Sequence, residues 1–315
     1  MDRATRPEIL DAGPDGVAKA ARLLREGGLV AVPTETVYGL AARADRDESV
    51  AAIYRAKGRP SFNPLIVHVE DLSAGEQLAH FDERAQMLAD AFWPGALTMV
   101  LPLREGAPIA RAVTAGLPTI ALRCPAHPVM RAVIAEAGVP LAAPSANRSG
   151  GVSPTEVAHV VASLGANVDA VIDGGQCEAG LESTIIALRE DGRWQVLRPG
   201  PIAEARIAAV LGQDSVPVTS QEIEAPGQLA SHYAPGKPVR LNATDAAADE
   251  FHIGFGSVSG DMTLSATGDL VEAAARLYAA LHAGAAAGQP RIAVAPIPEG
   301  DIGAAINDRL RRAAA

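Results

Sequence analysis

Stretches with helical spacing alternate with short apolar runs along the first two thirds of the chain, and this alternation constrains the fold most. In residues 14–26 apolar side chains recur every three or four positions, as on one face of a helix. Gly27 and Gly28 then favour a helix end, and residues 29–32 form an apolar run typical of a short buried strand. Repeats of helix and strand in this order predict an α/β protein, in which helices pack against a sheet.

The same criteria predict the other elements of residues 1–211. Helices are expected over residues 48–56, 83–92 and 202–211. Strands are expected over residues 65–69, 97–101, 119–123, 140–143, 170–172, 184–188 and 194–197. Residues 34–40 and 57–64 are predicted to be polar loops. Residues 153–156, Ser-Pro-Thr-Glu, have the spacing of a capping box, so another helix is expected to begin there.

The regular pattern stops at residue 212. Gly, Pro and polar residues are frequent from there to residue 238, and a segment of this length acts either as a slack tether or as a lid. Beyond it, three apolar runs and two helical segments predict a small α/β domain. The expected organisation is a catalytic domain over residues 1–211, a linker or lid over 212–238, and an accessory domain over 239–315.

The composition disfavours several classes of protein. A formal net charge of -10 and only 3% aromatic residues argue against broad nucleic-acid binding, although a local basic pocket can still bind a small polyanion. Cys124 and Cys177 are the only cysteines, so neither a zinc site nor a disulfide is expected. The apolar stretches are too short to span a bilayer and residues 1–4 lack a signal-peptide pattern, so a cytoplasmic protein is expected.

Clusters of polar residues follow the predicted strands, which is where α/β proteins bind ligands. They occupy residues 33–40, 57–64, 119–125, 142–151, 182–184 and 198–200. In the second cluster Lys57 and Arg59 flank a glycine that lets the backbone approach a phosphate. Arg123 leaves a buried strand, where an arginine either pairs with an internal acid or binds a ligand carboxylate. Each cluster alone is typical of a surface turn, and His68 alone of a core histidine; together they favour a binding site.

Seven short motifs occur in the order found in one family. They are PTETVYGL, KGRP-x-x-NPL, PGALT, APSAN-x-SG, ESTI, LRPG and HYAP, and they extend over essentially the whole chain. With them the sequence resembles the YrdC-like threonylcarbamoyl-AMP synthases in their longer, two-domain form. The resemblance implies an α/β fold with a twisted mixed sheet, flanking helices and an open cavity, followed by a small C-terminal Rossmann-like α/β domain.

The resemblance also implies roles for residues at the matching positions. Lys57 and Arg59 are the expected catalytic residues. The residues expected to bind ATP are Lys57, Arg59, Asn63, Thr119, Ser145, Asn147, Ser153, Arg198, His232 and Tyr233. Those expected to bind threonine are Thr36, His68, Arg123, Ala143 and Ser183. Related linkers often carry a basic residue shortly before HYAP, whereas this chain reads Gln-Leu-Ala-Ser over residues 228–231.

The implied reaction uses L-threonine, bicarbonate and ATP. Threonine takes up CO2 to give a carbamate, whose oxygen attacks the α-phosphate and expels pyrophosphate, so no side-chain nucleophile is needed. Mg2+ is expected on the phosphates of ATP rather than in a protein cage, and no metal ligands are expected. The product is expected to pass to a tRNA threonylcarbamoyl transferase that modifies an adenosine next to the anticodon; no membrane association and no stable nucleic-acid binding are expected. The alternatives are carbamoyl adenylation from carbamoyl phosphate and an RNA-binding regulatory module.

Overall fold

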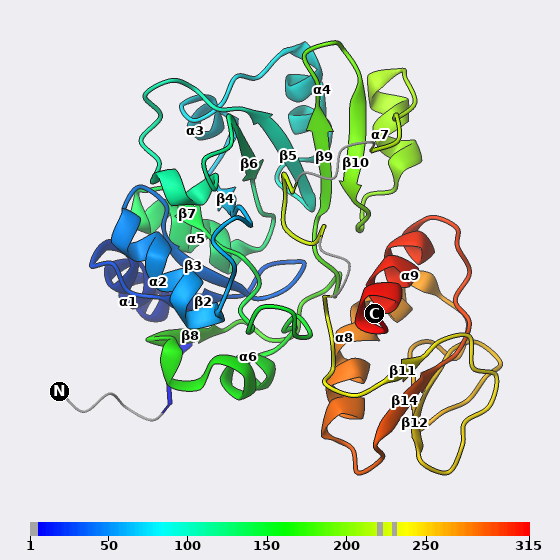
Figure 1. Cartoon of the computed structure of the whole chain (residues 1–315). Coiled ribbons are helices and arrows are strands. Elements are labelled where there is room, and N and C mark those ends of the chain that lie inside the picture. Colours follow the sequence, from blue (N-terminus) through cyan, green and yellow to red (C-terminus); the bar gives the residue numbers. More distant parts are fainter. Residues whose placement is uncertain (1–5, 219–222, 229–231) are drawn as a thin grey trace.

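Two sheets organise the chain. The computed structural model describes residues 6–218, 223–228 and 232–315. Within these ranges a ten-stranded sheet uses strands that end by Arg198, and a four-stranded sheet begins at Val239. Figure 1 shows the small sheet and its helices (yellow to red) beside the large unit, with α8 and α9 close to it.

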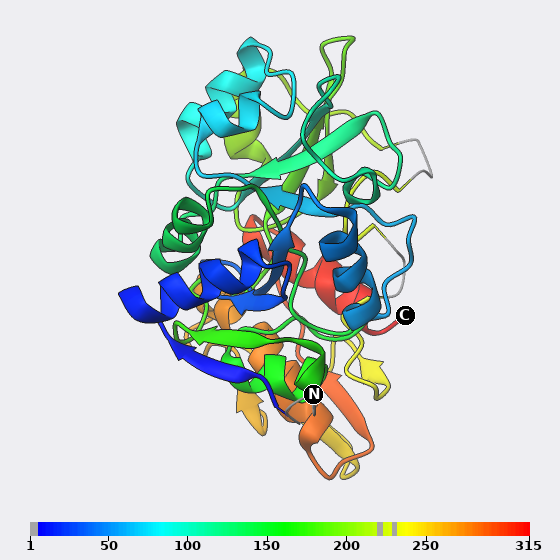
Figure 2. The ribbon, with the colours of Figure 1, turned by 90° about the vertical axis from the view of Figure 1, so that its left-hand side faces the viewer.

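The large sheet is mixed, as expected. Its strands, in spatial order, are β1 (Glu8–Asp11), β8 (Ala170–Asp173), β2 (Val30–Val32), β3 (Gly39–Arg43), β7 (Leu141–Ala142), β4 (Ile66–His68), β6 (Thr119–Arg123), β5 (Leu97–Pro102), β9 (Thr184–Leu188) and β10 (Trp194–Arg198). The pairs β1/β8, β2/β8, β4/β6 and β5/β9 are parallel, and the other pairs are antiparallel. Figure 2 shows β1 (blue) and β8 (green) side by side at one edge.

Helices cover both faces of this sheet. They are α1 (Pro14–Arg25), α2 (Asp47–Lys57), α3 (Leu72–Glu76), α4 (Glu83–Phe92), α5 (Pro128–Ala137), α6 (Val157–Leu164) and α7 (Glu204–Leu211), with 3-10 turns at Arg111–Val113 and Gly165–Asn167. Strand side chains alternate between faces. Val30 and Val32 therefore pack in one core cluster with Leu24 of α1. Ala31 faces the opposite side of the sheet and lies in a second cluster with Ile53 of α2.

The C-terminal unit has a parallel sheet and two helices, which agrees with the small α/β domain expected from the sequence. Its strands are β11 (Val239–Arg240), β14 (Arg291–Val294), β12 (Glu250–Gly254) and β13 (Met262–Thr263), in that order, and its helices are α8 (Leu270–Ala286) and α9 (Ile302–Ala313). The core of this unit is shared with the rest of the chain. Val37, Leu181 and Tyr233 are buried in the same cluster as Leu277 of α8.

The capping-box prediction was wrong. Helix α6 begins at Val157, and Glu156, in extended conformation, occupies the position before it. The Ser153 hydroxyl instead donates a hydrogen bond to the carboxylate of Glu182. That long-range bond satisfies the hydroxyl and removes it from the helix terminus, so residues 153–156 precede the helix rather than form its first turn.

The loop prediction over residues 34–40 was too long. Strand β3 begins at Gly39, between β2 and β7, and its first four residues are buried. Fully buried strands lack the alternation that marks half-exposed ones, and small residues weaken the signal further. Strands β1 and β13 and helices α3 and α5 were not predicted either, and apart from α5 these elements are only two to five residues long.

Candidate functional site

A buried cavity lies where strand ends of the large sheet meet the linker. It is lined by most of the site residues expected from the sequence, together with Glu182, Pro226 and Gly227. The expected residues are Thr36, Arg59, His68, Arg123, Ala143, Ser145, Ser183, Arg198, His232 and Tyr233. The cavity volume is about 40 Å3, enough for a few water molecules. Four linker residues, Pro226, Gly227, His232 and Tyr233, are part of this lining.

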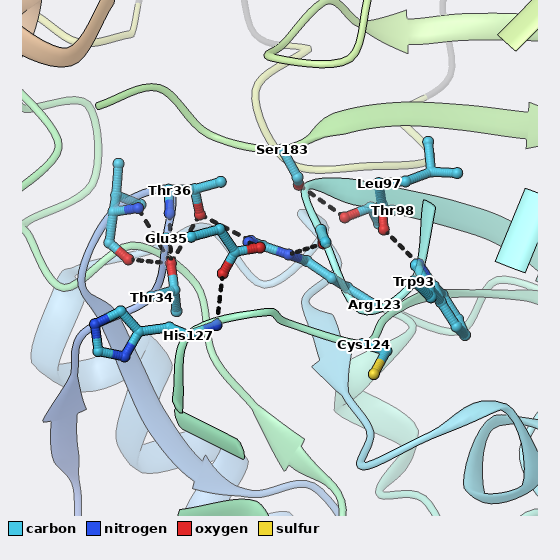
Figure 3. A network of polar contacts seen from close by, with 12 residues as sticks. Thr34, Glu35, Thr36, Trp93, Leu97, Thr98, Arg123, Cys124, His127 and Ser183 are labelled. Carbon is cyan, nitrogen blue, oxygen red and sulfur yellow. Dashed lines mark hydrogen bonds and ion pairs between the residues drawn. The ribbon is translucent and has the colours of Figure 1, made fainter. Parts of the chain in front are cut away.

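Sheet register brings the predicted threonine-site residues together. His68 and Arg123 are direct partners at the ends of the parallel strands β4 and β6, so their side chains leave the sheet at the same point. Ser183 precedes β9, and its hydroxyl lies 2.7 Å from the hydroxyl of Thr98 in β5. Figure 3 shows Arg123 reaching between this pair and Thr36.

Arg123 is paired with an internal acid. Its Nη2 lies 2.6 Å from Oε1 of Glu35, its Nη1 donates to Thr36 Oγ1 at 2.9 Å, and its Nε donates to a backbone carbonyl. Burial acts to raise the pKa of Glu35, but the charge and hydrogen bonds of Arg123 outweigh it, so the pKa is lowered overall. The sequence left two roles open for Arg123, and the structure contains the internal ion pair. The sequence analysis did not identify Glu35 as its partner, although Glu35 lies within the first polar cluster.

His68 does not behave as a satisfied core histidine. Both ring nitrogens are buried and have no hydrogen-bond partner among the described residues. Burial, followed by the neighbouring Arg123 charge, lowers the pKa of His68 to about 3, so the ring is neutral. A buried polar ring without partners is costly in a core, and its position in the cavity wall makes it available to a ligand.

Two buried guanidinium groups of the cavity have no acidic partner among the residues that the structure describes. Arg59 donates to the side chain of Asn63 at 2.6 Å and to a backbone carbonyl, and Arg198 donates to Ser183. In the described part of the chain neither has a carboxylate within 4 Å. Burial lowers the pKa of Arg59 to about 10 and also lowers that of Arg198. Buried cations without a directly paired carboxylate attract anions strongly, because little solvent screens them.

Lys57 lies behind the cavity wall rather than in it. It ends α2, and its Nζ donates to the backbone carbonyls of Ser145 and Asn147. Burial lowers the pKa of its ammonium group well below the usual value. In this arrangement Lys57 fixes the loop that presents Ser145, so the side chain of Lys57 must turn or the loop must shift before it reaches a ligand.

Four further predicted residues also lie outside the cavity lining. Asn63 holds Arg59, Asn147 donates to carbonyls of its own loop, and Ser153 binds Glu182. Thr119 begins β6, four residues before Arg123, and a strand of that length separates them by about 13 Å. Their proposed ATP contacts stay predictions.

Linker residues close one side of the cavity. His232 and Tyr233 are buried in its wall, and the His232 Nδ1 and the Tyr233 hydroxyl have no hydrogen-bond partner among the described residues. Tyr233 has a φ of 64°, a left-handed conformation that is uncommon for residues other than glycine. The Leu-Ala-Ser stretch before His232 lies outside the described residues, so the missing linker cation is not tested.

Metal-ligand clusters and membrane-spanning helices are absent from the described ranges. These ranges hold no group of three or more His, Cys, Asp or Glu residues that could bind a metal ion. Cys124 and Cys177 are buried free thiols. No helix in the same ranges is long and apolar enough to cross a bilayer.

The fold and the cavity define an α/β protein whose strand ends surround a cavity lined by buried Arg59, Arg123 and Arg198. Comparison with known proteins narrows this class. Residues 22–200 match the family model Sua5/YciO/YrdC, described as telomere recombination, and residues 202–315 match that of the threonylcarbamoyl-AMP synthase C-terminal domain. The chain therefore belongs to the threonylcarbamoyl-AMP synthase family of enzymes.

Individual relatives support the same family. The Bacillus subtilis threonylcarbamoyl-AMP synthase is 46% identical over 230 residues, which cover 71% of this chain and 66%, just under two thirds, of the relative. The Pyrococcus abyssi enzyme of the same name is 39% identical over 93% of this chain and 92% of its own. The crystal structure of P. abyssi Sua5 complexed with L-threonine superposes with a TM-score of 0.89 at 35% identity, covering 97% of both chains.

Proposed function

We propose that this chain forms threonylcarbamoyl-AMP and pyrophosphate from L-threonine, bicarbonate and ATP, for threonylcarbamoyladenosine synthesis in tRNA. The observation that carries the proposal is the pair Arg59 and Arg198, two buried cations of one cavity with no carboxylate within 4 Å in the described ranges. They favour the polyphosphate of ATP. The names of the relatives and the L-threonine in the P. abyssi structure support the assignment.

The chemistry follows from positioning and charge. Threonine nitrogen bonds to the carbon of CO2, derived from bicarbonate with loss of water, and the ammonium protons pass to solvent. A carbamate oxygen then bonds to the α-phosphorus of ATP while the bond from that phosphorus to the pyrophosphate oxygen breaks. Arg123 orients the threonine carboxylate, and Arg59 and Arg198 stabilise charge that develops on the phosphates.

In this scheme Mg2+ binds together with ATP rather than at a site formed by protein side chains. The carboxylate of Glu182 in the cavity wall is already bound by Arg309, and a single engaged carboxylate is a poor cage for a divalent cation. ATP phosphates would hold Mg2+, which neutralises part of their charge. Cytoplasmic location and transfer of the product to a tRNA threonylcarbamoyl transferase are part of the same proposal.

The linker is proposed to act as a lid. The present cavity is far smaller than the roughly 300 Å3 or more that a nucleotide-sized ligand needs. His232 and Tyr233 form part of the wall that closes it. We infer that these residues move aside when ATP enters and return over the bound substrates.

An activity assay separates this function from carbamoyl adenylation, and an RNA-capture assay separates it from the RNA-binding module. Purified full-length chain is incubated with ATP, Mg2+ and labelled bicarbonate, with and without L-threonine, and pyrophosphate and labelled adenylate are measured. We expect both products only when threonine is present. Threonine-independent pyrophosphate release that requires carbamoyl phosphate would favour carbamoyl adenylation, and tight, salt-sensitive RNA capture that ATP leaves unchanged would favour the RNA-binding module.

A further inference from the structure

A carboxylate in the cavity wall is bound by helices of the C-terminal unit. Glu182 Oε2 accepts a hydrogen bond from the Tyr278 hydroxyl of α8 at 2.7 Å and one from Arg309 Nε of α9 at 2.9 Å. The Ser153 hydroxyl donates to Oε1. Arg309 is fully buried and Glu182 is 6% exposed. No local pattern predicts this contact, because the two charged residues are 127 positions apart.

The same two helical residues hold the linker. The Tyr233 ring stacks on the Tyr278 ring with centroids 5.6 Å apart, and the Arg309 guanidinium lies 5.3 Å from the Tyr233 ring centroid. A cation over an aromatic face is attractive, and more so when both are buried. Adjacent backbone bonds complete the attachment: His232 N donates to the Arg312 carbonyl at 3.2 Å, and Ala234 N donates to the Gly150 carbonyl at 2.8 Å.

We propose that Arg309 and Tyr278 are positioning residues of the synthase site, which hold Glu182 and Tyr233 in one buried contact and so fix the linker across the cavity. The inference rests on the proposed function. It gives the C-terminal unit a part in the reaction although neither residue touches substrate: ATP binding depends on Tyr233 returning to this contact.

The electrostatics explain why an arginine is needed there. Glu182 is a carboxylate in the lining of a cavity that must attract phosphates. Arg309, which lies outside the lining, neutralises the charge of Glu182. Stability alone is a weak reason for the pair, since buried ion pairs are often no better than well-packed apolar residues. The Arg309 Nη2 also has no hydrogen-bond partner in the described ranges, a cost that an apolar side chain would avoid.

Steady-state kinetics separate positioning from structural support. We compare Arg309→Met, Arg309→Lys and Tyr278→Phe with Arg311→Met, whose exposed side chain forms an ion pair with exposed Glu299. We expect Arg309→Met to raise the KM for ATP about tenfold, with kcat within threefold of wild type, and Arg309→Lys to restore most of the affinity. A merely structural role predicts a smaller active fraction, that is, lower kcat at unchanged KM, and would overturn the proposal.

A double-mutant cycle tests the route through Tyr233. In a Tyr233→Ala background, Arg309→Met should raise the KM for ATP by clearly less than it does in the wild-type background, because the contact with Tyr233 is already gone and only the compensation of Glu182 is lost. Additive effects would overturn the proposal. If Arg309→Met fails to fold, Tyr278→Phe in the same cycle carries the test, with an expected two- to threefold rise in KM that disappears in the Tyr233→Ala background.

Amide hydrogen exchange gives a readout that needs no activity. The amides of His232 and Ala234 should exchange at least tenfold faster in Arg309→Met than in wild type. Their exchange rates should be unchanged in Arg311→Met. Equal protection in both variants would overturn the proposed contact. A wild-type chain that releases no pyrophosphate with threonine would instead refute the proposed function, while the exchange result would still decide whether Arg309 holds the linker.

Discussion

Arg123, in the wall of the cavity that the threonine carboxylate is proposed to enter, forms a buried ion pair with Glu35, with Nη2 and Oε1 2.6 Å apart. The Arg123 side chain is 4% exposed and that of Glu35 is 13% exposed. Because solvent screens them little, each charge is stabilised mainly by the other. Glu35 also accepts a hydrogen bond from the backbone of His127 at 3.3 Å (Figure 3). A carboxylate substrate must therefore share Arg123 with a residue that already neutralises it.

Glu35→Gln removes this neutralising charge. We expect the free energy of unfolding to fall by about 3 kcal/mol, since a buried cation is left uncompensated. Threonine should raise the thermal midpoint of the variant more than that of wild type, because its carboxylate replaces the lost charge. Differential scanning calorimetry with and without threonine measures both effects. Glu8→Gln, in an exposed pair with Lys19, is the control, and an equal loss of stability there would contradict the expectation.

Arg59→Met and Arg198→Met each remove a cavity cation that has no carboxylate within 4 Å in the described ranges. Each is expected to weaken ATP binding about tenfold or more, because a charged hydrogen bond to phosphate contributes about 1.5–3 kcal/mol. Isothermal titration calorimetry with a non-hydrolysable ATP analogue measures the affinity. Arg111→Met, an exposed position, should bind as wild type does. Wild-type affinity in both cavity variants would rule out these arginines as the phosphate site.

Gly227→Ala tests whether close packing of the linker against Arg198 and Tyr233 matters for ATP binding. Gly227 has a φ of 85°, and a Cβ there would lie 2.8 Å from Arg198 Cδ and 3.1 Å from the Tyr233 hydroxyl. The variant should raise the KM for ATP severalfold by displacing these side chains. Gly236→Ala shares the left-handed backbone penalty of about 1–2 kcal/mol but has nothing within 4 Å. If both variants alter the KM equally, backbone strain rather than the contact is responsible.

Buried histidines should make the chain less stable in mild acid. Burial lowers the pKa of His68 and His232 to about 3 and of His159 and His282 to about 4. The unfolded chain binds these protons near pH 6.5 and the folded chain does not, so stability is complete above that pH and falls below it. Urea unfolding should show a lower free energy at pH 5 than at pH 7. A flat profile would mean that these rings accept protons in the folded state.

Much of the α/β architecture could be predicted because its signals are local. The apolar spacing of residues 14–26 and the turn glycines after it depend only on neighbours within one or two helical turns. The prediction failed where distant residues intervene. Ser153 has the sequence context of a helix cap, but Glu182, 29 residues away, takes its hydroxyl.

The sequence by itself determined which residue types stand at the strand ends, and its motifs indicated the family. Tertiary structure alone decided their partners: His68 beside Arg123 through the β4/β6 register, and Glu182 against Arg309 across the two units. The physical reason is that charge pairing and desolvation act through space. Strand order and the packing of α8 and α9 set those distances, and no local pattern along the chain encodes them.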